Sequence, residues 1–225
     1  MGKVLYLRKG ETHTKPIKRP NKGQLITMDL GNGRKQYRVL KIVGTVAEVL
    51  AMYEYSTDQI FSAGNINSYL NAALDYALNV TFYTTLSQEA RNAIVPKMVQ
   101  QYTYLFSTSV FNENTHASYA NYSSKTPISS AENRRVYALD IEDIEEYFGG
   151  VFSKSDLWTL FWNTPSAPSV LTYPWLRSAV IGTSSDSWYV SGSSGFTYNY
   201  ASKGSGCAAR PAFQIDLTKI PWEVA

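Results

Sequence analysis

The stretch from residue 24 to residue 52 constrains the fold most, because its apolar and polar residues alternate and two short turns interrupt it. The turns are Gly31-Asn32-Gly33 and Gly44-Thr45, and the alternating runs are residues 25–30, 37–43 and 46–52. An Asn-Gly turn between alternating runs is the strongest short-range signal of a β-hairpin. We therefore predict a three-stranded antiparallel meander.

Two helical stretches follow the meander. Apolar residues recurring at spacings of three and four predict a helix that begins near Asn67 or Ser68 as its cap. A second helical stretch is predicted over residues 85–104, with Ser87 as N-cap and a bend or break at Pro96. Both helices are expected to support the core.

A strand and a capped helix are predicted next. Residues 134–139 are typical of a strand, and Asp140 caps a helix that ends at Gly149 and Gly150. The helix carries the acidic residues Glu142, Asp143, Glu145 and Glu146. Acidic side chains near a helix start are favoured by the helix dipole, so we expect a solvated face. A pair of catalytic carboxylates is the less favoured interpretation.

Two other segments are less regular. Residues 106–130 are polar and aperiodic, which predicts a loop with at most one short strand. Residues 156–163, if helical, place Trp158, Phe161 and Trp162 on one face. A core role for this face is favoured, and the alternative is that the segment flanks a binding surface.

Residues 182–206 have an unusual composition. They include eight Ser, five Gly and three Tyr, and their only charged residues are Asp186 and Lys203. Tyrosine and tryptophan give large contact area at low entropic cost, while Ser, Gly and Asn adapt their hydrogen bonding, as in antibody paratopes. The segment therefore indicates a binding surface. An ordinary β meander with core aromatics is the alternative, because short apolar alternation does not separate core from surface.

This segment lies between two motifs that suggest a family. Trp175-Leu176-Arg177-Ser178, the Trp188-Tyr189-Val190 strand and Arg210-Pro211-Ala212-Phe213-Gln214-Ile215-Asp216-Leu217 resemble a prophage-associated domain family of unassigned function. Residues 173–217 are also similar to the variable region of C-type-lectin-fold proteins that retroelements diversify. Mutation of template adenines in those proteins makes Tyr, Asn, Ser, Asp, Gly and Thr frequent at variable positions.

The resemblance implies a C-type-lectin-like α+β fold, with an antiparallel sheet, two or three packed helices and an irregular C-terminal half. It implies ligand binding by exposed side chains of the variable region. The candidate residues are Thr183, Ser184, Asp186, Trp188, Tyr189, Ser191, Ser193, Phe196, Tyr198, Asn199, Tyr200 and Ser202. Residues 24–225 are expected to form one domain, because no strong linker divides them.

Trp175, Arg177, Arg210 and Asp216 are expected to act as structural clamps at the ends of the variable region. A guanidinium in apolar surroundings needs carboxylate or carbonyl partners. Asp216 or Asp140 is the expected partner. We predict that the two arginines hold the hairpin ends and do not bind ligand.

Residues 1–23 are predicted to form an extended basic arm, with Pro16 and Pro20 favouring extended backbone. The net charge of +3 is too small to indicate nucleic acid by itself, and no stacking aromatics or recognition helix accompany the arm. Packing on a neighbouring subunit is the favoured role, giving a homo-oligomer or virion subunits. The sequence shows no secretory signal and no apolar run that would span a membrane, so we expect synthesis in the cytoplasm and association with a virion or tail.

Little in the sequence indicates catalysis, and no cofactor or metal is expected. The two histidines, His13 and His116, have no second ligand at zinc spacing. A dyad of His116 with Cys207, the single cysteine, is a minor alternative. The Glu-Pro-Asn and Gln-Pro-Asp triplets of calcium-dependent lectins are absent, and Asp186 is the only carboxylate of the stretch.

The predicted function is therefore non-catalytic binding of a host-surface protein or glycan by a phage or prophage protein. Two other functions remain open. A structural virion component would bury the aromatic surface between subunits. A hydrolase of cell-surface polymer would need a carboxylate pair in a cleft.

Overall fold

The computed structural model describes residues 19–104, 125–128, 131–150, 152–164, 172–192 and 195–225. Most of the predicted arm and of the predicted loop at 106–130 lies outside the described residues, as do Ser193 and both histidines. Within the described part, the chain is a mixed α+β protein. It is rich in mainly antiparallel strands and has few helices.

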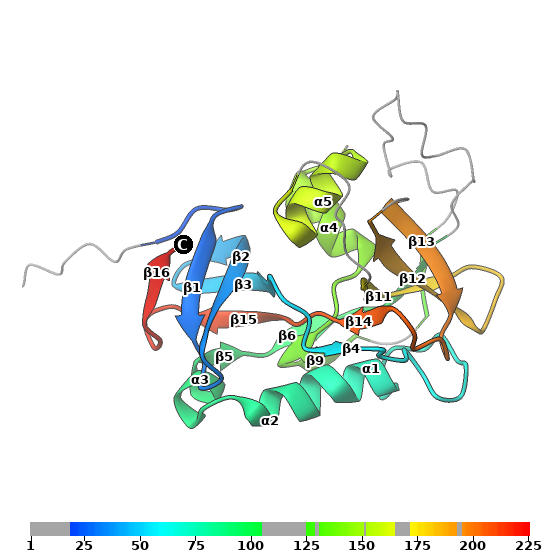
Figure 1. Cartoon of the computed structure of the whole chain (residues 1–225), viewed down its shortest axis with the longest axis horizontal. Coiled ribbons are helices and arrows are strands. Elements are labelled where there is room, and N and C mark those ends of the chain that lie inside the picture. Colours follow the sequence, from blue (N-terminus) through cyan, green and yellow to red (C-terminus); the bar gives the residue numbers. More distant parts are fainter. Residues whose placement is uncertain (1–18, 105–124, 129–130, 151, 165–171, 193–194) are drawn as a thin grey trace, which may run out of the picture.

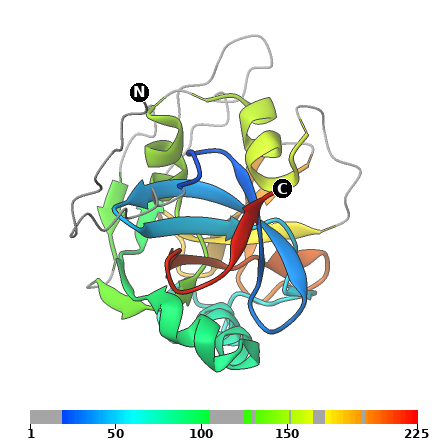
Figure 2. The ribbon, with the colours of Figure 1, turned by 90° about the vertical axis from the view of Figure 1, so that its left-hand side faces the viewer.

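The first sheet contains the meander. In spatial order its strands are β10 (Val136–Tyr137), β15 (Ala212–Asp216), β3 (Val46–Ala51), β2 (Arg34–Val43), β1 (Leu25–Asp29) and β16 (Trp222–Val224), and β5 (Ile94–Val95) also pairs with β15. The predicted meander is confirmed, since β1, β2 and β3 pair antiparallel in sequence order. Figure 2 looks onto this sheet, where the C-terminal β16 in red lies beside β1 in blue.

The second sheet contains the aromatic-rich region. Its strands are, in order, β13 (Gly195–Tyr200), β12 (Asp186–Ser191), β11 (Tyr173–Val180), β14 (Cys207–Ala209) and β4 (Ser56–Thr57). β7 (Tyr102–Tyr104) pairs with β11 and with β8 (Lys125–Pro127). β6 (Lys97–Val99) and β9 (Glu132–Arg134) form a separate two-stranded sheet. The pairs β11 with β14 and β11 with β7 are parallel.

The helices lie on two sides of the sheets (Figure 1). One group consists of α1 (Ala73–Tyr76), the π-helical segment η1 (Ala77–Phe82), α2 (Tyr83–Thr85) and α3 (Gln88–Ala93). The other consists of α4 (Ile141–Phe148) and α5 (Lys154–Trp162). Figure 1 shows the first group below the sheets in that view and the second above them. No helix of the described chain has the length and apolar character needed to cross a membrane.

The predicted helix start near Asn67 or Ser68 is wrong, because the helix begins at Ala73. The backbone around Asn67 bonds other segments instead, since Asn67 N–H donates to the Ser184 carbonyl at 2.8 Å. Asn71 has a positive φ of 64°, which a helix does not accommodate. Tertiary contacts thus override the helical periodicity before residue 73.

The second predicted helix begins correctly and ends early. Ser87 is its N-cap, with the Ala90 N–H donating to Ser87 Oγ at 3.1 Å, which agrees with the prediction. The helix stops at Ala93, not near residue 104. The next residues join strands β5, β6 and β7, where pairing with β15, β9 and β11 provides the hydrogen bonds of their backbone. Pro96 sits between β5 and β6 and has no N–H for a helix.

The helices α4 and α5 follow their predicted local signals. Asp140 caps α4 through a capping box, and Gly149 ends it in the left-handed conformation with φ 76°. The predicted strand before it is divided into β9 and β10 at Arg135. In α5 the buried residues are Leu157, Leu160 and Phe161, whereas Trp158 and Trp162 are half-buried.

Candidate functional site

The β12–β13 hairpin carries most of the predicted ligand-binding residues and divides them between two faces. Asp186 pairs with Tyr200, Trp188 with Tyr198, and Val190 with Phe196. Directly opposed residues share a face, and alternate residues point to opposite faces. Tyr189 and Asn199 therefore lie on the other face, and a flat ligand docked on one face does not reach the residues of the other.

The hairpin belongs to the core near Ser191 and Phe196, and at Trp188 on the inner strand β12. Trp188 is 4% exposed, and its indole N–H donates to the Ala179 carbonyl at 3.1 Å. Phe196 is 6% exposed and packs edge-on against Phe152, while Ser191 is 5% exposed. The prediction that Trp188, Ser191 and Phe196 contact a ligand is therefore corrected. α5 covers this end of the hairpin, and the indole N–H of Trp158 donates to the Ser191 carbonyl at 3.3 Å.

The outer end of the hairpin faces solvent. Tyr198 is 52% exposed and Tyr200 is 61% exposed. The predicted residues that gather at this end are Thr183, Ser184, Asp186, Tyr198, Tyr200 and Ser202, and we call them the hairpin surface. They stay together because the Ala201 N–H donates to the Ser185 carbonyl at 2.7 Å. The Tyr198 ring also packs edge-on against the buried Trp188, with ring centroids 5.2 Å apart.

Tyr189 and Asn199 lie on the opposite face, and both are half-buried. The Tyr189 ring packs against Trp175 and Tyr173, with centroid separations of 5.5 Å and 5.6 Å. Burial raises the pKa of the Tyr189 hydroxyl, although hydrogen bonds with Thr197 and Asn199 oppose the shift. This face of the sheet is uncharged at these positions and presents the half-buried rings of Tyr173 and Tyr189.

Asn67 fixes the loop that leads into the hairpin, and the sequence prediction missed this role. Its side-chain amide donates to the Thr183 carbonyl at 2.8 Å and to the Asp186 carbonyl at 3.1 Å. Asn67 is buried, so these bonds are shielded from water. The sequence pattern around Asn67 predicts a helix cap, and only the structure shows that its side chain is buried against the loop before β12.

Arg177 lies on β11, the strand that pairs with β12 of the hairpin, and connects it to neighbouring segments. Its guanidinium donates from Nη1 to Asp143 Oδ2 at 2.5 Å and to the Ala138 carbonyl at 2.7 Å. Nε donates to the Gln100 carbonyl at 2.8 Å and lies 3.9 Å from Asp140 Oδ2. The expected partner Asp140 is thus present, but Asp143 makes the direct ion pair.

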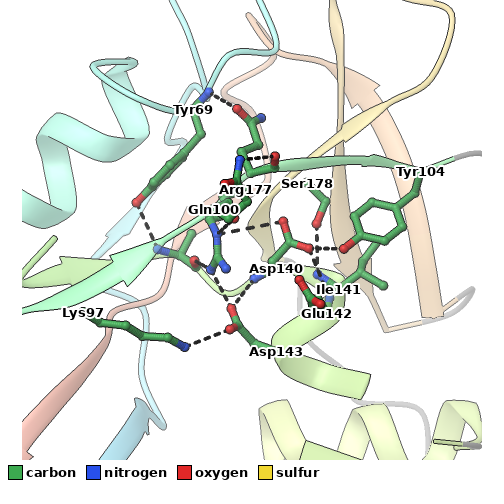
Figure 3. Close-up of polar contacts among 12 residues, drawn as sticks. Tyr69, Lys97, Gln100, Tyr104, Asp140, Ile141, Glu142, Asp143, Arg177 and Ser178 are labelled. Carbon is green, nitrogen blue, oxygen red and sulfur yellow. Dashed lines mark hydrogen bonds and ion pairs between the residues drawn. The ribbon is translucent and has the colours of Figure 1, made fainter. Parts of the chain in front are cut away.

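Asp143 connects Arg177 to a second ion pair, so the prediction of a solvated acidic face is wrong for Asp143, whereas Glu146 on the same helix is exposed. Lys97 Nζ lies 2.9 Å from Asp143 Oδ1 and 2.7 Å from Glu48 Oε1. Figure 3 shows Arg177 and Lys97 reaching Asp143 from different directions. We call Glu48, Lys97, Asp140, Asp143 and Arg177 the ionic cluster. It joins β3, β6, α4 and β11, so it ties both sheets to one helix.

The ionic cluster keeps its charges through mutual contact. Burial alone would raise the pKa of Asp143, but Arg177 and Lys97 outweigh it and hold that pKa well below its usual range. Burial would likewise lower the pKa of Lys97, and the carboxylates of Asp143 and Glu48 raise it. Burial dominates at Asp140 and raises its pKa despite Arg177. Asp140 is fully buried at the α4 cap, where Tyr104 donates a hydrogen bond to it.

Arg210 is the second arginine clamp, and its partner differs from the prediction. It contacts the Glu54 carboxylate and the Phe161 carbonyl. Asp216 lies elsewhere, in a turn where it accepts hydrogen bonds from Thr218 N–H at 3.1 Å and Thr218 Oγ1 at 2.7 Å. Asp216 is therefore a turn residue and not a clamp partner. Trp175 is buried and donates to the Gln59 carbonyl at 2.7 Å, which fits its predicted structural role.

The groups considered for catalysis are buried or already paired in the described part of the chain. Cys207 is buried, and burial raises the pKa of its thiol to about 11, so little reactive thiolate forms at neutral pH. The carboxylates of Glu48 and Asp143 both line an open cavity, but each of them already contacts Lys97. The described residues form no cluster of three or more metal-ligating side chains. Comparison of this chain with protein-family models, with curated proteins and with solved structures finds no match.

Proposed function

We propose that this protein is a non-catalytic ligand-binding protein that contacts its partner through the hairpin surface. The observation that carries the proposal is the exposure of Tyr198 and Tyr200 beside short hydroxyl side chains on an anchored backbone. Large aromatic side chains next to small polar ones give contact area and adaptable hydrogen bonds. Anchoring reduces the ordering cost that binding would otherwise incur.

The sequence motifs support a more specific form of this proposal. We infer a C-type-lectin-like scaffold, encoded by a phage or prophage and associated with a virion or tail. The partner is a host-surface protein or glycan. The residues free to vary in such a scaffold are those of the hairpin surface, because their side chains leave the core while Trp188 and Phe196 remain packed.

The double substitution Tyr198→Ala and Tyr200→Ala tests the binding site. Labelled protein is applied to a panel of intact bacterial cells and immobilised glycans, and the double variant is expected to lose at least about tenfold in affinity, as for aromatic anchors. Tyr76→Ala is the matched control, because Tyr76 on α1 is also 61% exposed and lies outside the hairpin surface. Equal loss in both variants, or no loss in either, would contradict the proposal.

Diversification is tested separately in the flanking DNA. We expect a near-repeat of the codons for residues 173–217 that differs only at adenines. Without such a repeat the claim of diversification fails, and the binding experiment still decides the role of the hairpin surface. A large interface between copies that buries Tyr198 and Tyr200 would favour a structural virion component instead.

A further inference from the structure

The face of the first sheet next to α4 carries a row of side chains from four adjacent strands. Strand register places Val95 of β5 opposite Gln214 of β15, Gln214 opposite Glu48 of β3, and Glu48 opposite Lys41 of β2. Directly opposed residues share one face of a sheet. The row therefore forms a continuous surface on which the amide of Gln214, the carboxylate of Glu48 and the ammonium of Lys41 follow one another across the strands.

Two open cavities lie on this surface and share Lys41 and Glu48. The first has a volume of about 160 Å³, and its wall is one face of α4 with Lys22. Its lining residues are Lys22, Leu40, Lys41, Glu48, Asp143, Glu146 and Tyr147. The second has a volume of about 320 Å³ and extends over Val43, Val46, Val95 and Gln214. A charged compartment therefore adjoins an aliphatic one.

Glu48 is the central group of the two cavities. It is only 6% exposed, and both of its hydrogen bonds, from Lys97 Nζ at 2.7 Å and Tyr137 OH at 2.6 Å, go to Oε1. Among the described residues no hydrogen bond reaches Oε2. Oε2 is not among the fully buried atoms that lack a partner, so it borders the cavities that Glu48 lines, where water or a ligand can supply a donor. Oε2 therefore favours a ligand that brings an N–H donor, and a charged donor most of all.

Two further polar groups beside Glu48 are also unused within the described chain. The Gln214 amide, directly across from Glu48, has no hydrogen bond there, and Lys22 contacts only the Tyr147 ring, 5.1 Å from its centroid. Lys41 at the rim pairs with Glu146 in an exposed contact. A ligand therefore meets an acceptor at Glu48 and a cation at Lys22.

We propose that the two cavities bind a small zwitterion of the amino-acid class with an aliphatic side chain. Its ammonium group donates to Glu48 Oε2 and the Gln214 carbonyl oxygen, and its carboxylate faces Lys22. Its side chain covers Val43, Val46 and Val95, of which Val43 is 66% exposed without a ligand. Burial of that aliphatic surface adds to the binding free energy.

Simpler ligands fit the same residues less well. A purely cationic ligand would meet the carboxylates of the first cavity but would leave Lys22 without a counter-ion. A purely anionic ligand would face the Glu48 carboxylate. A zwitterion places a cation beside Glu48 and an anion beside Lys22, so these two residues together favour it over either singly charged ligand.

The proposal is tested with L-leucine as the probe and the full chain as the receptor. Calorimetry and the methyl resonances of Val43, Val46 and Val95 are expected to show saturable binding at millimolar leucine. Two analogues test the charges: 4-methylpentanoate lacks the ammonium group, and 3-methylbutylamine lacks the carboxylate. Each is expected to bind at least about tenfold more weakly, the range for a lost hydrogen bond to a charged group. Equal binding of either analogue overturns the proposal.

Substitutions locate the site. Glu48→Gln is expected to weaken leucine binding at least about tenfold, and Gln214→Ala several-fold. Gln214→Ala guards against loss of folding, because the Gln214 side chain makes no hydrogen bond within the described chain. Gln36→Ala on the exposed part of β2 lies outside both cavities and is expected to leave binding unchanged. Absence of leucine binding, or binding that Gln214→Ala leaves unchanged, overturns the assignment.

Discussion

The ionic cluster and the hairpin surface differ in composition and burial in opposite ways. The cluster consists of charged side chains, yet Arg177 is 3% exposed and Asp140 is fully buried. The hairpin surface belongs to an aromatic-rich stretch, yet Tyr198 and Tyr200 stand more than half exposed. Polarity alone would place the two regions the other way round.

The difference shows that the number of partners decides burial here. Arg177 donates hydrogen bonds to the carbonyls of Gln100 and Ala138 and to the carboxylate of Asp143, so its charge is compensated inside the protein. The polar tips of Tyr198 and Tyr200 are exposed to solvent and remain available to a visiting molecule. The ionic cluster is therefore buried and fully engaged with its neighbours, whereas Tyr198 and Tyr200 of the hairpin surface are exposed.

The largest expected effect comes from breaking the ionic cluster. Arg177→Met removes the cation that faces Asp140 and Asp143 and leaves both carboxylates buried, which is expected to lower the free energy of unfolding by about 3–5 kcal/mol. Arg34→Met is the matched control, because the Arg34–Glu223 pair is exposed, and its loss is expected to cost less than about 1 kcal/mol. Denaturant titration measures both. A similar small cost for the two variants would remove the contrast between buried and exposed charge.

The second effect divides the hairpin itself. Trp188→Ala is expected to lower the free energy of unfolding by about 3–4 kcal/mol, because it empties a packed indole site and removes the hydrogen bond to Ala179. Tyr200→Ala is expected to change stability by about 0.5 kcal/mol or less, as for a surface site. Thermal or chemical unfolding compares them. Equal costs would mean that Trp188 on the inner strand and Tyr200 on the edge strand are not in different environments.

The pH dependence of stability tests the ionic cluster without a substitution in the reference protein. The folded-state pKa of Asp143 lies below that of an unfolded aspartate, which is about 3.9. Between these two values the unfolded chain binds the extra proton, so the stability that Asp143 contributes is present above about pH 4 and is lost as the pH falls. Asp143→Asn is expected to remove about 2 kcal/mol of this acid-dependent loss. Unfolding curves of both proteins from neutral to acidic pH measure the slope, and an unchanged slope contradicts the assignment.

The smallest effect concerns the link between scaffold and surface. Asn67→Ala removes the two hydrogen bonds that hold the carbonyls of Thr183 and Asp186, and is expected to cost about 1–2 kcal/mol. Amide hydrogen exchange is expected to rise first in the loop before β12, because that loop loses its anchor. Faster exchange spread evenly over the chain would show that Asn67 supports the core and not the surface. Asn92→Ala on α3 provides an asparagine control away from this loop.

Local signals predicted the elements that depend on neighbouring residues. The Asn32-Gly33 turn predicted the meander, and Ser87 and Asp140 marked helix starts that the structure confirms. Where distant partners decide, the same signals failed. Asn67 satisfies carbonyls more than 100 residues away, and the backbone beyond Ala93 joins three different strands.

The candidate site was predicted only in part, for a related reason. The composition of residues 182–206 indicated a binding surface, with a β meander as the alternative, and the register of β12 and β13 in the structure assigns the side chains to two faces. Alternation says nothing about packing across the sheet: Trp188 on the inner strand β12 is buried, whereas Tyr198, directly opposite on the edge strand β13, is exposed. It also does not reveal that Phe152 packs against Phe196. Asp143 is a similar case: its place in an acidic run predicted an exposed side chain, and the sequence does not show that Lys97 and Arg177 pack against it.

The sequence by itself determined the strand meander, the caps of α3 and α4, and a stretch rich in tyrosine and serine between two arginines. These features follow from interactions within a few residues, which a sequence displays directly. Only the tertiary structure decided that Arg177 meets Asp143, that Arg210 meets Glu54, and which side chains of the hairpin are exposed. Such choices depend on which surfaces the packed sheets and helices bring together, and desolvation makes a partner necessary only once that packing exists.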